Sequence, residues 1–173
     1  MNLLQSFKPV TTFIFDLDGV LTDANILVYE TGEQVRRMSV KDGYALQLAV
    51  KKEYRVAVFS GGNGLGAKNR LLKLGITDVF LQVQDKKKKI EEYLELHQLQ
   101  WNEILYMGDD IPDYAVLKMA GLPCAPSDAV PEVLQIAKYI STFSGGKGCV
   151  RDVIEKVLRL HDNWDLQTAV VSG

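Results

Sequence analysis

The chain has 173 residues, a length that predicts a single domain over residues 1–173. Hydrophobic residues make up 47% and charged residues 24%, so the composition excludes disordered, collagen-like and coiled-coil chains. With 20 basic and 22 acidic residues, the formal net charge of −2 argues against a nucleic-acid-binding protein. The two cysteines by themselves are too few for a disulfide framework or a four-ligand zinc site, and the two histidines are too few for a His-rich metal site.

The N-terminal segment lacks the pattern of a secretory signal, because the apolar run Val10–Phe15 is short and ends at Asp16. No stretch approaches the roughly 18 apolar residues that a membrane-spanning helix requires. We therefore expect a cytoplasmic protein that binds neither membranes nor nucleic acids.

The first third of the chain predicts two buried strands with a hairpin and a helix between them. The β-branched and aromatic run Val10–Phe15 is typical of a fully buried strand. A Gly-bearing turn within residues 25–40 predicts a β-hairpin, and a helix is expected over about residues 41–52. Arg55–Phe59 has the pattern of a second buried strand, which a Ser-Gly-Gly sequence ends.

Helical and strand-like segments alternate through the rest of the chain, and glycine follows two of the helical segments at the position typical of a helix end. The expected helices are residues 65–74, 86–99, 113–120, about 130–137, and a last helix with Val150, Val153, Ile154, Val157 and Leu158 on one face. The expected strands are residues 78–83, 103–107 and about 122–125, and residues 161–173 are expected to form a tail.

Strands that alternate with helices predict βαβ units and therefore an α/β fold, a doubly wound, Rossmann-like parallel sheet with helices on both faces. The hairpin at residues 25–40 is then a small insertion after the first strand. Ligands of such folds bind outside the carboxyl ends of the strands. The residues that follow the strands are therefore the candidates for a functional site.

Acidic residues follow two of the predicted strands. Asp16 and Asp18 come directly after the first strand, and residues two apart in an extended segment point to the same side. Asp109 follows the strand at residues 103–107. Carboxylates gathered in one place repel one another unless a cation neutralises them. Without Cys or His nearby, these hard oxygen ligands favour Mg²⁺ over zinc.

Ser60, Gly61 and Lys86 could hold an anion through a hydroxyl group, backbone N–H groups and a positive charge. Carboxylates, a metal and a phosphate cradle together suggest phosphoryl transfer to a nucleophilic aspartate. Each feature alone has a structural explanation: a helix N-cap for Ser60, a solvated lysine run for Lys86, and turn caps for the acids. Their occurrence at successive strand ends favours the functional interpretation.

These motifs resemble, in order, the four motifs of the haloacid dehalogenase-like phosphatase superfamily, over nearly the whole chain. The residues concerned are Asp16-Leu-Asp18-Gly-Val-Leu-Thr22, Ser60, Lys86 and Gly108-Asp-Asp-Ile-Pro-Asp113. Three further stretches, at residues 41–43, 69–76 and 144–152, resemble the branch that hydrolyses 3-deoxy-D-manno-octulosonate 8-phosphate in lipopolysaccharide sugar synthesis.

The resemblance implies a Mg²⁺-dependent phosphatase that forms an aspartyl-phosphate. Asp16 would attack phosphorus, and Asp18 would protonate the leaving sugar oxygen and then activate water. Mg²⁺ would be bound by the carboxylates of Asp16 and Asp109 and the backbone carbonyl of Asp18, with Asp110 and Asp113 in support. Ser60, Gly61 and Lys86 would hold the phosphoryl oxygens. Candidates for the sugar-acid carboxylate, or for contacts between subunits, are Arg70, Lys147 and Arg151.

Larger members of the superfamily insert a cap domain between their motifs. Here the predicted elements fill the intervals from Asp18 to Ser60 and from Ser60 to Lys86, so no cap fits. Capless relatives close the site with neighbouring subunits. The resemblance therefore implies a homotetramer with the hairpin at residues 25–40 and the segment 144–173 at its interfaces.

Two alternatives remain open. Relatives that act on nine-carbon keto-deoxy sugar acid 9-phosphates share the motifs but carry a glutamate where this chain has Gly62, which favours the eight-carbon substrate. Gly62-Asn63 also departs from the arginine that is usual in many eight-carbon enzymes. A receiver-type signalling domain also combines acids, Ser/Thr and Lys on a parallel sheet, but in a different chain order.

Overall fold

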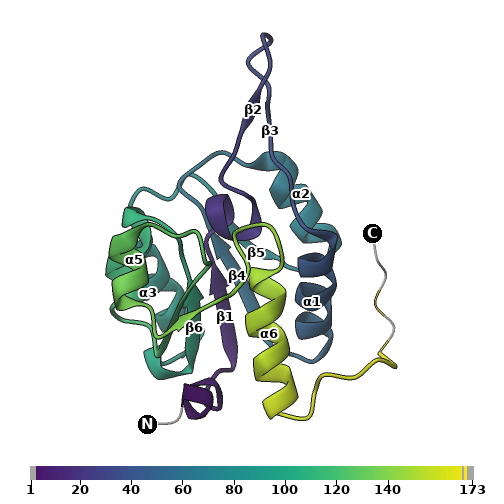
Figure 1. The fold of residues 1–173 in the computed structure, drawn as a ribbon, viewed down its shortest axis with the longest axis vertical. Helices are drawn as coiled ribbons and strands as arrows, with labels where there is room; N and C mark the ends of the chain where they lie inside the picture. Colours follow the sequence, from purple (N-terminus) through teal and green to yellow (C-terminus); the bar gives the residue numbers. More distant parts are fainter. Residues whose placement is uncertain (1–2, 169, 171–173) are drawn as a thin grey trace.

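The computed structural model describes residues 3–168 and residue 170. Six parallel strands form one sheet in the order β5-β4-β1-β6-β7-β8 (Figure 1). The strands are β1 Thr12–Phe15, β4 Arg55–Phe59, β5 Asp78–Phe80, β6 Ile104–Met107, β7 Leu122–Ala125 and β8 Tyr139–Ile140. The predicted α/β fold is confirmed, and the described residues include no cap domain.

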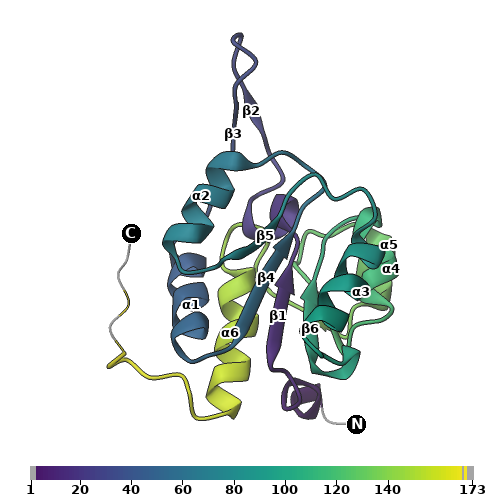
Figure 2. The same cartoon turned by 180° about the vertical axis from the view of Figure 1, so that it is seen from behind.

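Helices cover both faces of this sheet, as Figures 1 and 2 show from opposite sides. The α-helices are α1 Val40–Lys51, α2 Leu65–Lys73, α3 Lys86–Leu96, α4 Tyr114–Leu117, α5 Pro131–Ile136 and α6 Cys149–Leu160. Short 3₁₀ turns occupy Leu3–Phe7, Trp101–Glu103 and Ile111–Asp113, and a wider helical turn occupies Leu17–Leu21. Among the described residues, no helix is both long and apolar enough to cross a membrane.

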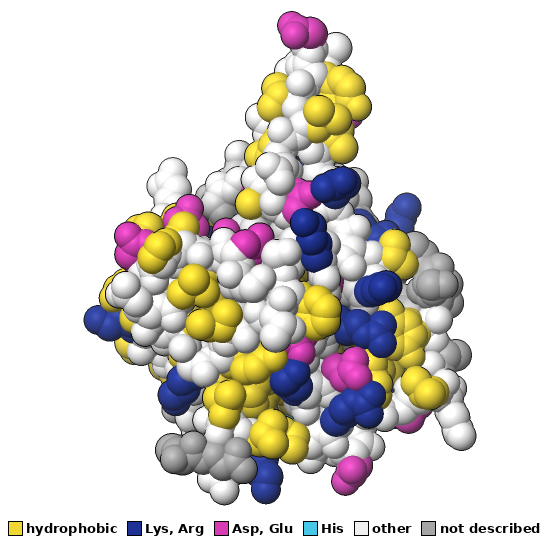
Figure 3. All heavy atoms as spheres, viewed as in Figure 1, with side chains coloured by type: hydrophobic (Ala, Val, Ile, Leu, Met, Phe, Trp, Pro, Cys, Tyr) yellow, Lys and Arg dark blue, Asp and Glu magenta, His cyan; other side chains and the backbone are white. Residues whose placement is uncertain are grey.

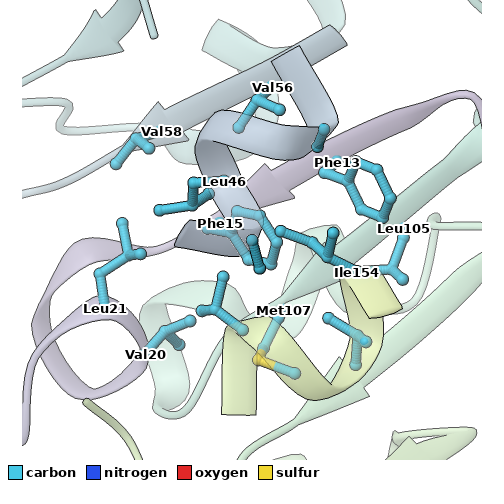
Figure 4. Close-up of a cluster of buried hydrophobic side chains, with 14 of the residues drawn as sticks. Phe13, Phe15, Val20, Leu21, Leu46, Val56, Val58, Leu105, Met107 and Ile154 are labelled. Atoms are coloured by element: carbon cyan, nitrogen blue, oxygen red, sulfur yellow. The ribbon is translucent and has the colours of Figure 1, made fainter. Parts of the chain in front are cut away.

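Alternation along β1 builds a separate core on each face of the sheet, since successive strand residues point to opposite faces. Phe13 and Phe15 belong to a core that includes Leu46 of α1 and Ile154 of α6 (Figure 4). Ile14 belongs to the opposite core, together with Ile90 of α3. All six side chains are at most 1% exposed, so β1 is the buried central strand that its apolar sequence predicts.

The strand order creates one topological switch point. From β1 the chain builds β4 and β5 on one side of the sheet, and then it crosses over to build β6, β7 and β8 on the other. The loops that follow β1 and β6 therefore diverge at neighbouring strands and leave a crevice between them, where ligands of open α/β sheets bind. Asp16 follows β1 directly, and Asp109 follows β6 after one glycine.

The insertion after β1 is a hairpin of β2 Leu27–Val28 and β3 Gln34–Val35, which projects beyond the end of the sheet (Figures 1 and 2). The predicted hairpin at residues 25–40 is thus confirmed, although its paired segment is shorter. Hydrophobic side chains lie open on its surface (Figure 3), and Leu27 and Val28 are 59% and 61% exposed.

Several predicted boundaries need correction. The strand expected over residues 78–83 ends at Phe80, the helix expected over 86–99 ends at Leu96, and the helix expected over 113–120 is a 3₁₀ turn followed by the short α4. The helix over 86–99 stops early because Gln98 has a positive φ of 55°, which a helix cannot contain. The edge strand β8 lay within a segment with no predicted element. Of the tail predicted over residues 161–173, residues 169 and 171–173 lie outside the described residues.

A buried carboxylate joins α1 to α6. Asp42 is 1% exposed, and its two oxygens accept hydrogen bonds from the backbone N–H groups of Gly148, at 3.2 Å, and Arg151, at 2.8 Å. The first N–H groups of a helix have no partner within the helix. Asp42 therefore caps α6 from a position more than 100 residues earlier in the chain.

We expect Asp42→Ala to lower the free energy of unfolding by about 2 kcal/mol, because two buried N–H groups lose their acceptor. Urea denaturation would measure this loss. Glu91→Ala serves as the control: it removes an exposed pair with Lys87 of α3, whose atoms are 3.7 Å apart, and should change stability by less than about 0.5 kcal/mol. Equal effects of the two substitutions would contradict the capping role.

Candidate active site

One cleft of about 640 Å³ lies at the carboxyl ends of the strands. The predicted catalytic, phosphate-binding and metal-binding residues all line it, namely Asp16, Asp18, Ser60, Gly61, Lys86 and Asp109. They come from the loops after β1, β4 and β6 and from the first turn of α3. The rule that residues after parallel strands meet at one edge of the sheet therefore located the cleft correctly.

The loop after β1 depends on a glycine at its tightest point. Gly19 has φ +91°, and a Cβ there would lie only 1.9 Å from Oδ2 of Asp109. A side chain at position 19 would thus push away the carboxylate that follows β6. The glycine allows the two acidic loops, from neighbouring strands, to come together.

The loop after β4 is fixed by short-range hydrogen bonds. The Ser60 hydroxyl accepts a hydrogen bond from the N–H of Gly62 at 3.1 Å. The N–H groups of Gln82 and Val83 donate to the carbonyls of Gly62 and Ser60, at 3.1 and 3.0 Å. These bonds explain why β5 ends at Phe80: the residues after it turn back to hold the Ser60 loop instead of extending the sheet.

Lys86 lies at the start of α3, where Asp85 caps the helix by accepting a hydrogen bond from the N–H of Lys88. The Lys86 side chain is 6% exposed, and its Nζ lies 2.7 Å from Asp16 Oδ1 and 2.7 Å from Asp113 Oδ1. Burial lowers the pKa of Lys86, but the carboxylates of Asp113 and Asp16 outweigh burial and raise it overall. Lys86 is therefore a permanent positive charge in the cleft and not part of a solvated lysine run.

Three carboxylates converge around this lysine. Oxygens of Asp16, Asp109 and Asp113 all lie within 4.8 Å of one another. Burial and the charge of Asp113 raise the pKa of Asp16 to about 8, although Lys86 opposes the shift. Burial and the charges of Asp113 and Asp110 raise the pKa of Asp109 to about 7. Asp16 and Asp109 resist ionisation because they are buried and lie close to other carboxylates, so the group of three fits a hard divalent cation such as Mg²⁺.

Asp113 is more central than its sequence position indicates, since the sequence suggested only a supporting role. It is fully buried, and it accepts hydrogen bonds from the hydroxyl of Tyr106, from Lys86 and from the N–H of Asp109. Tyr106 was missed altogether. It lies in β6 and donates to Asp113 from beneath the cleft, and the only signal was one phenol in an otherwise aliphatic strand. Asp110 is exposed and caps the 3₁₀ turn through the N–H of Ile111.

Arg36, which directly follows the returning strand β3 of the hairpin, is the second residue that the sequence did not indicate. Its Nε lies 2.7 Å from Oδ1 of Asp18, and its Nη2 lies 3.3 Å from Oδ2. The carboxylate of Asp18 is therefore directed to the hairpin, away from the cluster of three acids. No strand-end rule points to Arg36, because the hairpin is an insertion outside the main sheet.

The three candidates for a sugar-acid carboxylate lie outside the cleft within this chain. Arg70 lines a groove of about 700 Å³ between the hairpin and α2. Lys147 and Arg151 line another cavity, along α6. The guanidinium of Arg151 lies 5.6 Å from the ring of Tyr44 and 5.3 Å from that of Trp164. Binding of substrate by these three residues stays a prediction.

Comparison with known proteins identifies the family. A sequence profile described as haloacid dehalogenase-like hydrolase matches residues 73–153. The 3-deoxy-D-manno-octulosonate 8-phosphate phosphatase of Yersinia pestis is 31% identical over 169 residues, which cover 98% of this chain and 90% of that protein. The chain belongs to the 3-deoxy-D-manno-octulosonate 8-phosphate phosphatase family. The corresponding protein of Escherichia coli K12 is 32% identical over 95% of this chain and 87% of its own length.

Solved structures of this phosphatase family have the same fold. The Yersinia pestis enzyme superposes with a TM-score of 0.90 at 32% identity, over 93% of this chain and 87% of that chain. The Moraxella catarrhalis enzyme, solved with a magnesium ion, a phosphate ion and KDO, gives a TM-score of 0.88 at 27% identity, over 93% and 92%. Family membership and the residues that line the cleft both identify the protein as a phosphatase of the haloacid dehalogenase-like class.

Proposed function

We propose that the protein hydrolyses 3-deoxy-D-manno-octulosonate 8-phosphate through an aspartyl-phosphate on Asp16. The observation that carries this proposal is the buried contact of Lys86 with Asp16, beside a second acid, Asp18, in the same cleft. Lys86 orients the nucleophilic carboxylate and attracts the phosphoryl group. Family membership supplies the sugar-acid substrate.

The two acids at the end of β1 have different surroundings, and these suit different roles. Asp16 is buried beside Lys86, so its carboxylate is held in place as a nucleophile. The side chain of Asp18 is 32% exposed, which lets it exchange protons with the leaving sugar oxygen and then with water. Ser60 and the N–H groups of its loop would bind the phosphoryl oxygens that Lys86 does not reach.

Mg²⁺ would be held by the carboxylates of Asp16 and Asp109 and by the backbone carbonyl of Asp18, with Asp113 oriented behind them. Its chemical contribution would be to neutralise the carboxylates and the phosphoryl oxygens as they approach one another. The raised pKa values of Asp16 and Asp109 support a cation at this place, because two carboxylates that resist ionisation gain most from a positive charge.

We expect Mg²⁺ to stabilise the protein more at pH 8 than at pH 6. At pH 6, Asp16 and Asp109 keep protons that the cation must displace, since their pKa values are raised to about 8 and about 7. As pH rises, the metal-free protein loses stability through these groups, because its folded state binds more protons than its unfolded state. Thermal unfolding with MgCl₂, against NaCl of equal ionic strength, measures the effect. Equal shifts at both pH values would contradict it.

The substrate is tested by measuring phosphate release, with and without Mg²⁺, from the eight-carbon and nine-carbon keto-deoxy sugar acid phosphates and from simple hexose phosphates. A Mg²⁺-dependent preference for the eight-carbon acid is expected. Preference for the nine-carbon acid would select the alternative within the superfamily. No release from any compound would favour the receiver-type alternative, against which family membership already argues.

We also propose that the protein is a homotetramer in the cytoplasm. The exposed apolar side chains of Leu27, Val28 and Tyr29 on the projecting hairpin support an interface there, because exposed apolar surface of this kind is typical of association sites (Figure 3). Light scattering coupled to size exclusion tests the assembly, and an active monomer would contradict it.

A further inference from the structure

Arg36 lies between two hollows of the surface. It lines the groove of about 700 Å³ between the hairpin and α2, while its partner Asp18 lines the catalytic cleft. Its side chain is only 8% exposed, so the guanidinium is held in place and does not extend freely into solvent. A long cation fixed at a boundary between two hollows is suited to contact a molecule that extends from one to the other.

The ion pair with Asp18 uses only one edge of the guanidinium. Nε and Nη2 face the carboxylate oxygens at 2.7 and 3.3 Å. A guanidinium has five N–H donors in a planar fork, so three remain, and the two terminal nitrogens keep between them the donors that a second carboxylate would need for two bonds. Among the described residues, no other side chain or carbonyl accepts a hydrogen bond from Arg36.

Gly62 provides the space for this arrangement. A Cβ at position 62 would lie 3.2 Å from Oδ2 of Asp18 and 3.3 Å from Nη2 of Arg36, closer than ordinary van der Waals contact. The same point is 3.7 Å from the Ser60 hydroxyl. The guanidinium of Arg36 therefore reaches the rim of the phosphate-binding loop at Gly62, where no side chain stands in its way.

We propose that Arg36 is a specificity-determining residue whose guanidinium binds the carboxylate of the substrate's sugar-acid part. The inference rests on the proposed function. Asp18 would protonate the oxygen that links the sugar to phosphorus. Side chains in contact with Asp18 therefore border the sugar part of the substrate, whereas Lys86 and Ser60 face the phosphoryl group. A carboxylate on that sugar would pair with the N–H groups of Arg36 that Asp18 does not use.

The test compares substrates that differ only in this charge. The first pair is 3-deoxy-D-manno-octulosonate 8-phosphate and its C1 methyl ester, assayed for kcat/KM. Arg36→Met should lower kcat/KM for the acid ten- to hundredfold and for the ester less than threefold, because a charge-assisted bidentate contact is lost only with the acid. Arg36→Lys should restore part of the difference, since it keeps the charge without the fork.

Arg37→Met is the matched control. Arg37 follows Arg36 directly in the segment between β3 and α1, its side chain is 83% exposed, and it pairs with Asp23 instead of Asp18. Arg37→Met should leave kcat/KM unchanged for both the acid and the ester. If Arg36→Met lowered kcat/KM equally for the acid and for the ester, Arg36 would act only through Asp18 and the proposal would be overturned. Unchanged kcat/KM for both substrates would overturn it as well.

A second pair separates this inference from the identity of the substrate. The inhibition constants of 6-phosphogluconate and glucitol 6-phosphate against hydrolysis of p-nitrophenyl phosphate compare an acid with a neutral alcohol of equal length. Wild type should bind the acid more tightly, and Arg36→Met should remove that preference. If 3-deoxy-D-manno-octulosonate 8-phosphate is not hydrolysed but this preference behaves as expected, the proposed substrate is wrong and the role of Arg36 stands. If Arg36→Met leaves the preference unchanged, the role of Arg36 is wrong.

Discussion

Asp16→Asn should reduce kcat by at least about a thousandfold, because an amide cannot attack phosphorus to form the covalent intermediate. The same change should leave the metal-free protein as stable as wild type or more stable. It removes one charge from three carboxylates whose oxygens lie within 4.8 Å of one another. Phosphate release with Mg²⁺ present, together with thermal unfolding, separates lost chemistry from lost folding.

Asp162→Asn is the matched control for this prediction. Asp162 carries the same functional group, but it is exposed, follows α6 and does not line the cleft. Its substitution should change kcat less than about threefold, as is usual for surface changes away from the reacting groups. If Asp16→Asn kept more than a tenth of the wild-type kcat, the covalent mechanism would be wrong.

Lys86→Met should damage both activity and stability. Its Nζ contacts Asp16 and Asp113 at 2.7 Å each, and removing the cation leaves these two buried carboxylates without their positively charged partner. Breaking a buried pair in this way typically costs about 3–5 kcal/mol. The loss of a positioned donor to the phosphoryl group should lower kcat by about a hundredfold or more.

The pH dependence identifies the cause of this destabilisation. Without Lys86, Asp16 avoids the unpaired charge by binding a proton, which happens more readily at pH 6 than at pH 8. Urea denaturation should therefore show a smaller loss at pH 6. Lys87→Met is the control, because Lys87 is exposed and pairs with Glu91 across one helical turn at 3.7 Å. A loss independent of pH would mean that packing of the lysine chain, and not its charge, is responsible.

The sequence alone predicted the parts of the fold that depend on local pattern. The run Thr12–Phe15 is apolar because both of its faces are covered, and the residues after it are acidic because they leave the sheet at its ligand-binding edge. Element type followed from periodicity along most of the chain. The exact ends of β5 and α3 did not, because long-range hydrogen bonds and a single left-handed residue decide them.

The residues of the site also fall into those that the sequence predicted and those that it did not. Asp16, Asp18, Ser60, Lys86 and Asp109 were predictable because parallel strands bring their carboxyl ends to one edge whatever the loops contain. Arg36, Tyr106 and the central place of Asp113 were not. Their contacts join a hairpin insertion, a strand interior and a 3₁₀ turn to that edge, and no sequence period links such positions.

The sequence by itself thus determined which chemistry this protein carries: the acids, the hydroxyl and the lysine, and their order along the strands. Only the tertiary structure decided how each group is tuned. Burial and the distance to neighbouring charges set the pKa of a carboxylate, and both are properties of the packed chain. Hence Asp16 faces a lysine in a buried pocket, while Asp18, two residues later, faces an arginine from the hairpin.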